Sequence, residues 1–260
     1  MRIKMKRSRI KSVLGIWCAA SVFFLNADAA EQKIMETEKT VKEETYIVAI
    51  DAGHQGSGQD MTGMEPNAPG SDIMKARIVS GTQGSFTGIA ESELNLSVAL
   101  KLEKELKERG YEVVMTRTEQ EVNLSNIDRA KIASEAEADI TVRIHANGSE
   151  DSSVSGALTM IPSQANLYVG YLYEDSYRLA QCILESYCEA TGLLNDGVME
   201  TDSMTGINWS TMPVTILEMG FMTNQGDDLY MADETNQKIM ADAIADGIDT
   251  YFSQKGSTIK

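Results

Sequence analysis

Cysteine is scarce in this chain, with three in 260 residues, and none is placed to build a disulfide scaffold. Cys182 and Cys188 lie six residues apart in a segment with a helical pattern. They are about 120 degrees from each other around the helix axis, so we do not expect them to bridge. Their mid-helix positions also argue against a cysteine nucleophile. The fold must therefore be stabilised by its hydrophobic core.

Aromatic residues and net positive charge are also lacking. Aromatics make up 6% of the chain, too few for a platform on which single-stranded nucleic acid would stack. The formal net charge is −16, which excludes binding of nucleic acid or an anionic membrane through a general electrostatic field. We expect no nucleic-acid partner, and no membrane partner once the leader described next is removed.

The first 29 residues have the three-part pattern of a secretory signal peptide. Residues 1–11 carry basic side chains and no acid, residues 12–25 are almost wholly apolar, and small residues flank Asp28. The apolar run is short for a membrane-spanning helix, and an uncleaved anchor is the alternative. Cleavage would remove six basic residues and one acidic residue, which lowers the formal charge from −16 to −21. We expect a secreted protein of the cell wall or periplasmic space, with residues 30–44 as a charged linker.

From about Thr45 the hydrophobic pattern alternates between strand and helix. Strands are predicted at 46–50, 111–116 and 139–144, and helices at 91–109 and 124–136. This order predicts right-handed crossovers and a single α/β domain with a largely parallel sheet covered by helices on both faces.

The second half of the chain is less regular. It predicts strands at 156–161 and 213–218, helices at 171–191 and 236–252, and a loop-rich segment over 193–211. The stretch 55–88 holds seven glycines and two of the four prolines, with little periodicity. Long irregular stretches in compact domains are often functional. We interpret this one as a rim or lid over the site, with a tolerated surface excursion as the alternative.

Histidine is the rarest chemically useful residue, and both copies lie where a predicted strand ends. His54 follows strand 46–50, and His145 follows strand 139–144. Sites in parallel α/β sheets gather outside the carboxyl ends of the strands. Neutral imidazole is also a common zinc ligand. The matching positions therefore favour a metal site over two unrelated surface or core histidines.

Two glutamates complete the candidate site. Glu91 opens helix 91–109 on the same stripe as Leu94 and Val98, so it should point inward, whereas Glu93 faces a more exposed direction. Glu91 could instead only complement the helix dipole. Glu218 ends a buried strand, where a purely structural carboxylate would need an arginine or backbone partner.

Two histidines and one glutamate form a common catalytic zinc set, with a fourth position open to water. We therefore expect His54, Glu91 and His145 to hold Zn²⁺ and Glu218 to act as the catalytic base. Arg143 and Asn147 flank the third ligand and are candidates for substrate binding. A closed structural zinc site is the less favoured alternative, because such sites commonly use cysteines.

Four segments carry these residues in order, and each contains a recognisable motif. They are Ile50-Asp51-Ala52-Gly53-His54, Glu91-Ser92-Glu93-Leu94-Asn95-Leu96, Arg143-Ile144-His145-Ala146-Asn147 and Leu217-Glu218-Met219-Gly220-Phe221-Met222-Thr223-Asn224. Together they resemble the motifs of zinc-dependent N-acetylmuramoyl-L-alanine amidases of the type-3 family. Segment 110–118 and Arg129 match as well. The resemblance spans residues 46 to 252, and Ala52 departs from it where the family usually has proline.

The resemblance implies a catalytic domain over 45–254 built on a mixed sheet, with a C-terminal tail at 255–260. It also implies hydrolysis of the amide between N-acetylmuramic acid and L-alanine in peptidoglycan, as in a cell-wall autolysin. A zinc peptidase that cuts within the stem peptide and a non-catalytic peptidoglycan-binding protein are the alternatives. An unidentified wall-targeting or activating partner is also compatible with the sequence.

Overall fold

The computed structural model describes residues 45–58 and 61–257. The predicted signal peptide and charged linker lie outside these residues. Among the helices that are described, none combines the length and apolar character needed to cross a membrane.

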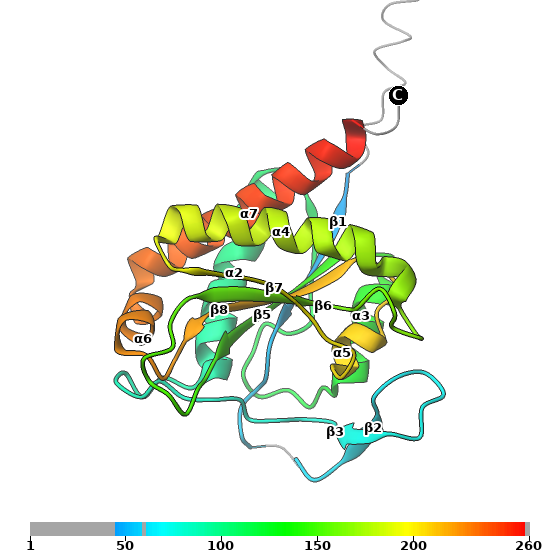
Figure 1. Cartoon of the computed structure of the whole chain (residues 1–260), viewed down its shortest axis with the longest axis horizontal. Helices are drawn as coiled ribbons and strands as arrows, with labels where there is room; N and C mark the ends of the chain where they lie inside the picture. The colour runs from blue at the N-terminus through cyan, green and yellow to red at the C-terminus, as the bar shows by residue number, and fades with distance from the viewer. Residues whose placement is uncertain (1–44, 59–60, 258–260) are drawn as a thin grey trace, which may run out of the picture. The chain divides into compact units, whose positions relative to one another are not determined.

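A six-stranded sheet forms the centre of the fold, in the order β4-β1-β5-β8-β6-β7 (Figure 1). The strands are β1 (Ile47–Ala52), β4 (Glu112–Met115), β5 (Ile140–Asn147), β6 (Ala157–Ile161), β7 (Asn195–Glu200) and β8 (Val214–Phe221). Strands β4, β1, β5 and β8 are parallel to one another. Strand β6 runs antiparallel to β8, and β7 is parallel to β6. The prediction of a mixed, mostly parallel sheet is confirmed.

Helices cover both faces of this sheet, as predicted. Three long helices share one face: α2 (Glu91–Glu108), α4 (Tyr173–Thr191), which follows the short 3-10 turn η1 (Gly170–Leu172), and α7 (Glu234–Ser257). The other face carries α3 (Asn126–Glu135) and α5 (Thr205–Asn208). In β1, Val48 and Ile50 face the first group, while Ala49 packs against α3. This alternation follows from the two-residue period of a strand.

Helix boundaries follow local sequence signals. Helix α3 begins after Ser125, whose hydroxyl accepts from the backbone N–H of Asp128, while the Asp128 carboxylate accepts from the backbone N–H of Ser125. This reciprocal capping box satisfies two orphan donors of the first turn. Helix α4 ends at Gly192, which adopts the left-handed conformation with φ of 73°.

Three segments differ from the sequence-based prediction. Segment 193–211, predicted as mainly loop, contains β7 and α5, and an additional helix α6 (Gln225–Ala232) follows β8. The irregular stretch 55–88 contains a two-stranded antiparallel hairpin of β2 (Met64–Pro66) and β3 (Met74–Ala76). Each of these elements is short or mostly polar, so its periodicity gives little signal, and contacts with distant residues stabilise it instead.

The packing of α4 against α7 depends on one glycine. A Cβ atom on Gly247 in α7 would lie 2.5 Å from the Cα of Ile183 and 2.8 Å from the carbonyl oxygen of Cys182, both backbone atoms of α4. Side chains can rotate away from an inserted methyl group, whereas a helix backbone cannot. The close approach of the two helices therefore requires a residue without a side chain at this position.

We predict that Gly247→Ala lowers the free energy of unfolding by about 2 kcal/mol, because overpacking pushes α7 away from α4. Lys238→Ala on an exposed turn of the same helix is the matched control and should change stability little. Urea unfolding followed by circular dichroism measures both. A Gly247→Ala variant as stable as the control would contradict this account of the helix contact.

Candidate active site

The predicted site residues converge at the carboxyl ends of the three central strands. His54 follows β1, His145 lies near the end of β5, and Glu218 lies in β8, directly opposite His145 in the strand register. Strands β1, β5 and β8 are neighbours in the sheet although they are far apart in sequence. Parallel strands end at the same edge, so their terminal side chains share one region of space.

His54, Glu91 and His145 form a compact cluster. One possible ligand atom from each residue lies within 4.8 Å of the others. The Oε1 atom of Glu91 is 3.1 Å from Nε2 of His54 and 3.1 Å from Nδ1 of His145. Two zinc ligands in tetrahedral geometry, each about 2.1 Å from the ion, lie roughly 3.4 Å apart, so the spacing is compatible with a shared metal ion.

The backbone and a hydrogen bond orient His54. Its φ of 59° lies in the left-handed region, which non-glycine residues seldom adopt. Its Nδ1 is 2.7 Å from the carbonyl oxygen of Val79, which can accept a hydrogen bond from that nitrogen. Such a bond leaves Nε2, on the side of Glu91, with a free lone pair, as in histidines that ligate metals.

Glu91 is held by several donors at the start of α2. Its Oε2 accepts from the backbone N–H of Thr82 at 2.8 Å, and its Oε1 accepts from the side-chain amide of Asn95 at 3.2 Å and the backbone N–H of Ala146 at 3.2 Å. Burial alone would raise the pKa of Glu91, but hydrogen bonds with His145 and His54 outweigh burial and hold the pKa well below its usual range. The side chain is thus an ionised carboxylate with a fixed orientation.

The environment of His145 also favours the form of the side chain that can bind a metal ion. Burial lowers the pKa of His145 to about 4, although its hydrogen bond with Glu91 acts in the opposite direction. The imidazole is therefore neutral near pH 7, the form that binds metals. Its Nε2 is buried and has no hydrogen-bond partner among the described residues. The nitrogen that faces Glu91, with a spacing that fits a shared metal ion, is Nδ1.

Two glycines make room for this cluster. A Cβ atom on Gly53 would collide with the His145 ring, and a Cβ atom on Gly81 would lie 2.5 Å from Oε2 of Glu91 and 2.8 Å from Cδ2 of His54. The donor set and the space that these two glycines leave agree with the size and chemistry of a divalent transition metal.

Glu218 lies beside the cluster without a binding partner of its own. Its carboxylate makes no hydrogen bond or ion pair with any other described residue. Burial, followed by the charge of Glu91, raises the pKa of Glu218 to about 8, while Arg143 acts in the opposite direction. The arginine or backbone partner that a purely structural carboxylate would need is therefore not bound to it.

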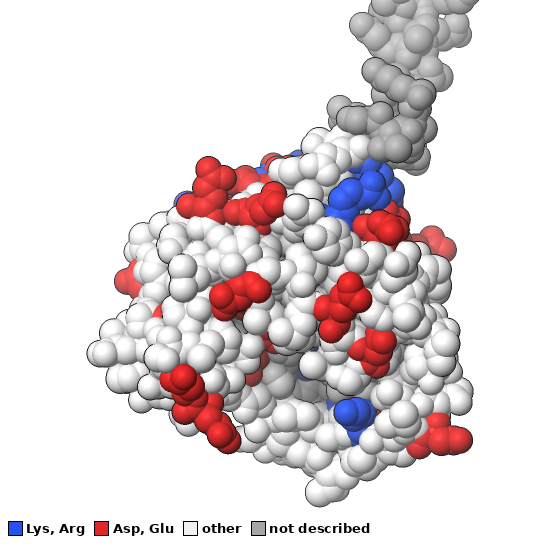
Figure 2. All heavy atoms as spheres, in the orientation of Figure 1, with Lys and Arg blue, Asp and Glu red and all other residues white. Residues whose placement is uncertain are grey.

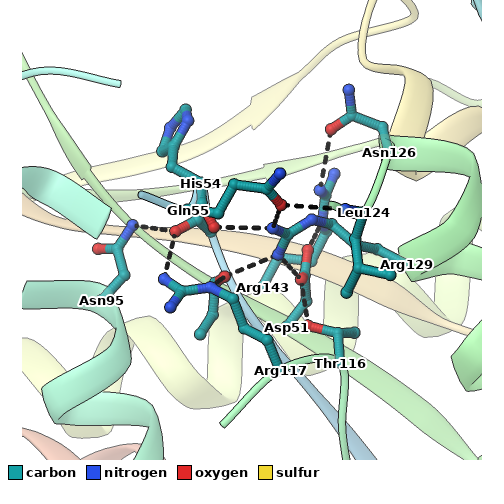
Figure 3. A network of polar contacts seen from close by, with 12 residues as sticks. Asp51, His54, Gln55, Asn95, Thr116, Arg117, Leu124, Asn126, Arg129 and Arg143 are labelled. Atoms are coloured by element: carbon teal, nitrogen blue, oxygen red, sulfur yellow. Dashed lines mark hydrogen bonds and ion pairs between the residues drawn. The ribbon is translucent and has the colours of Figure 1, made fainter. Parts of the chain in front are cut away.

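A buried polar network supports the loop that carries His54 (Figure 3). Asp51 binds Arg129 and Arg143 through its two oxygens, at 2.7 Å in each case, and accepts from the hydroxyl of Thr116 at 2.6 Å. Burial would raise the pKa of Asp51, but the two guanidinium groups hold it well below its usual range. The carboxylate is therefore ionised in the interior.

Arg129 and a further arginine, Arg117, bind the backbone that follows Asp51. Arg129 donates to the carbonyl oxygens of Ala52 and His54, at 2.8 and 2.7 Å. Arg117 donates to the carbonyl oxygens of Ala52 at 2.8 Å and Gly53 at 3.0 Å. Burial, followed by repulsion from Arg129, lowers the pKa of Arg117 to about 10. These bonds fix the tight turn on which His54 depends.

The two predicted substrate-binding residues lie on different sides of the cluster. Arg143 is buried, and its Nε is bound to Asp51, while its guanidinium group lines a cavity that also contains His145 and Glu218. Asn147 lines a second cavity beyond the histidines, and its Oδ1 accepts from the backbone N–H of Gly148. Substrate binding by either residue stays a prediction.

The sequence-based reasoning did not identify Asp51, Gln55 and Asn95 as parts of the site. Asp51 gave a usable signal, since a carboxylate inside a buried strand needs a cationic partner. Asn95 also had one, because it lies one helical turn after Glu91. Gln55 had no comparable signal.

Comparison with known proteins agrees with this geometry. The N-acetylmuramoyl-L-alanine amidase family matches residues 48–250. A crystal structure of an N-acetylmuramoyl-L-alanine amidase from Clostridium difficile 630 superposes with a TM-score of 0.67 at 26% identity, covering 82% of this chain and 99% of that one. The catalytic domain of the amidase CwlV from Bacillus (Paenibacillus) polymyxa var. colistinus gives a TM-score of 0.64 at 30% identity, covering 80% and 99%.

The chain therefore belongs to the type-3 N-acetylmuramoyl-L-alanine amidase family. It is an enzyme of that class, which hydrolyses the amide bond between N-acetylmuramic acid and L-alanine in peptidoglycan. Among individual proteins, it is similar to the uncharacterized protein YqiI of Bacillus subtilis (strain 168), with 34% identity over 211 residues, which covers 81% of this chain and 87% of YqiI.

We predict that Asp51→Asn lowers the free energy of unfolding at pH 7 by about 3 kcal/mol, because it leaves buried arginines without their counter-ion. Since the pKa of Asp51 is lowered in the folded state, its contribution is present above its unfolded pKa of about 4 and is lost as the pH falls. The difference between wild type and variant should therefore narrow on acidification.

Glu103→Gln, which removes an exposed ion pair with Lys107 on α2, is the control for this variant and should cost only a few tenths of a kcal/mol. Urea unfolding over a pH series measures both variants. Equal stability of the two variants at pH 7 would contradict the supporting role of the Asp51 network.

Proposed function

We propose that the enzyme is a zinc-dependent amidase in which His54, Glu91 and His145 hold the metal. Zinc bound there would polarise the scissile carbonyl and lower the pKa of a water molecule at its open position. The observation that carries this proposal is the convergence of three ligand atoms within 4.8 Å beside an unpaired carboxylate. Zinc is the metal that this donor set commonly binds in hydrolases.

Glu218 is then the catalytic carboxylate. Without a metal, a pKa of about 8 keeps Glu218 protonated at neutral pH, and the positive charge of zinc beside it would lower that pKa. The ionised carboxylate would then accept the proton of the attacking water and pass it to the nitrogen of L-alanine, so that the peptide would leave as a neutral amine. The position of Glu218 on the strand next to His145 supports this role. A protein that only bound peptidoglycan would have no use for such a carboxylate, which disfavours the non-catalytic alternative.

The family disfavours the second alternative, a peptidase acting within the stem, because its members are amidases that act where the stem meets the sugar. The proposal also retains the location expected from the sequence: residues 1–29 direct export, and the enzyme works in the cell wall or periplasmic space. Its charge of about −21 after cleavage repels anionic wall polymers, so an unidentified targeting or activating partner would assist docking.

We predict that Glu91→Gln reduces bound zinc by at least tenfold, because the neutral amide is a poor ligand and changes the bonds to both histidines. Glu93→Gln, two residues further along the same helix and exposed, is the matched control and should keep one zinc per chain. Metal analysis of the purified proteins measures this. Equal zinc content in both variants would show that Glu91 is not a ligand.

We further predict that Glu218→Ala keeps the metal but slows cleavage of labelled cell walls by 10²-fold or more, the usual contribution of a general base. His145→Ala should lose both the metal and the activity. Mass spectrometry of wild-type digests should show free muramic lactyl groups and intact stem peptides. A Glu218→Ala variant of normal activity would refute the role of Glu218, and cut stems would support the peptidase.

A further inference from the structure

Two cavities of different chemistry meet at the metal cluster. The first, of about 410 Å³, extends from His54, His145 and Glu218 toward β3 and α5. The second, of about 510 Å³, extends from the same cluster toward residues 147–150 and Thr223. An amidase must hold a sugar on one side of the scissile bond and a peptide on the other. Two cavities that meet at the cluster are compatible with this requirement.

The first cavity is cationic in an otherwise acidic protein. Four basic side chains line it: Lys75, Arg77, Arg129 and Arg143. The second cavity has no lysine or arginine in its lining, which consists largely of hydroxyl, amide and carboxylate groups. Figure 2 shows a hollow in the face it presents, with a basic side chain at its edge and mainly acidic side chains on the surface around it.

Lys75 in β3 and Arg77, the residue directly after β3, both line the cavity. The hairpin of β2 and β3 is bound to the rest of the domain by hydrogen bonds. Glu65 in β2 accepts from the backbone N–H groups of Asn126 and Ile127 at the start of α3, at 3.1 and 3.3 Å. The carbonyl oxygen of Pro66 accepts from the indole nitrogen of Trp209 at 3.0 Å. The two basic side chains are thus held at the cavity by a fixed part of the fold.

Among the described residues, the ammonium group of Lys75 has no ion pair or hydrogen bond, so its charge is available to a ligand. Arg77 is partly engaged, with one hydrogen bond to Asn123 at 3.1 Å and a carboxylate oxygen of Asp128 at 3.9 Å. In the same cavity, the guanidinium group of Arg143 lies against Gly206, where a Cβ atom would collide with it.

A further donor in the lining is unsatisfied. Gln55 is 1% exposed, and its Oε1 accepts from Arg129 at 2.8 Å. Its Nε2 is buried and has no hydrogen-bond partner among the described residues. A buried N–H group without an acceptor is costly, which indicates that an acceptor from a ligand completes it. Free positive charge and an unpaired donor in one cavity together call for an anionic acceptor.

We propose that the cavity lined by Lys75, Arg77, Arg143 and Gln55 binds the stem peptide through the free α-carboxylate of its second residue. This inference rests on the proposed function. The second residue of the stem is joined onward through its side-chain carboxyl group, which leaves its α-carboxyl group ionised unless it is amidated. The sugar, which offers hydroxyl and amide groups, then occupies the second cavity.

The test compares two synthetic N-acetylmuramoyl tripeptides that differ only in whether this α-carboxyl group is free or a carboxamide. The zinc-loaded enzyme should cleave the free carboxylate with a kcat/KM about tenfold higher, through KM, because a charge-assisted hydrogen bond is lost on amidation. Lys75→Gln should bring the ratio close to one, and Lys75→Arg should largely restore it. Lys104→Gln, on an exposed part of α2, is the control and should keep the wild-type ratio.

Equal kcat/KM values of the wild-type enzyme for the two substrates would overturn the proposal. A Lys75→Gln variant whose kcat/KM falls by the same factor for both substrates would also overturn it. Lys75 would then attract both substrates without distinguishing the carboxylate from the carboxamide. Calorimetric binding of the two product tripeptides separates this proposal from the proposed function. A further outcome is that neither substrate is cleaved while the peptide with the free carboxylate still binds about tenfold more tightly, and only when Lys75 is present. That result would support the assignment of the cavity and contradict the proposed amidase reaction.

Discussion

The buried ion cluster around Asp51 is the interaction on which the site depends. One carboxylate holds Arg129 and Arg143, and the arginines Arg129 and Arg117 bind the carbonyl oxygens of residues 52–54. A buried ion pair contributes little net stability, but it fixes geometry strongly, because breaking it leaves an uncompensated charge. Here it holds His54 in an unfavourable left-handed conformation, a strain that only a rigid surrounding can maintain.

This cluster also gives the site its electrostatic character. Two buried guanidinium groups bind the single carboxylate of Asp51, and the buried guanidinium group of Arg117 binds the adjacent backbone, so the local field is positive although the chain is strongly acidic. A positive field favours anions, among them the oxyanion that develops during amide hydrolysis and the carboxylates of a peptide stem. The support of His54 and the proposed recognition of the substrate thus share Arg143.

The sheet order explains how few residues suffice for the chemistry. Strands β1, β5 and β8 lie next to one another, so one side chain from each reaches a common point, and Glu91 joins them from the first turn of α2. The glycine-rich stretch 55–88 borders the site. It contributes Gly81 and Val79 next to the ligands and Lys75 and Arg77 in the adjacent cavity.

The sequence alone determined the features that depend on short-range patterns. These are the strands that lead to His54 and His145, the helix stripe that separates Glu91 from Glu93, and the mostly parallel sheet. These features follow from the periodicity of hydrophobic residues, which is visible within a short segment of the sequence. Only the tertiary structure decided the direction of β6 and β7, the partners of Asp51, the orphaned nitrogen of Gln55 and the position of Lys75. Each of these depends on contacts between residues far apart in the chain, and local periodicity carries no information about which distant groups meet.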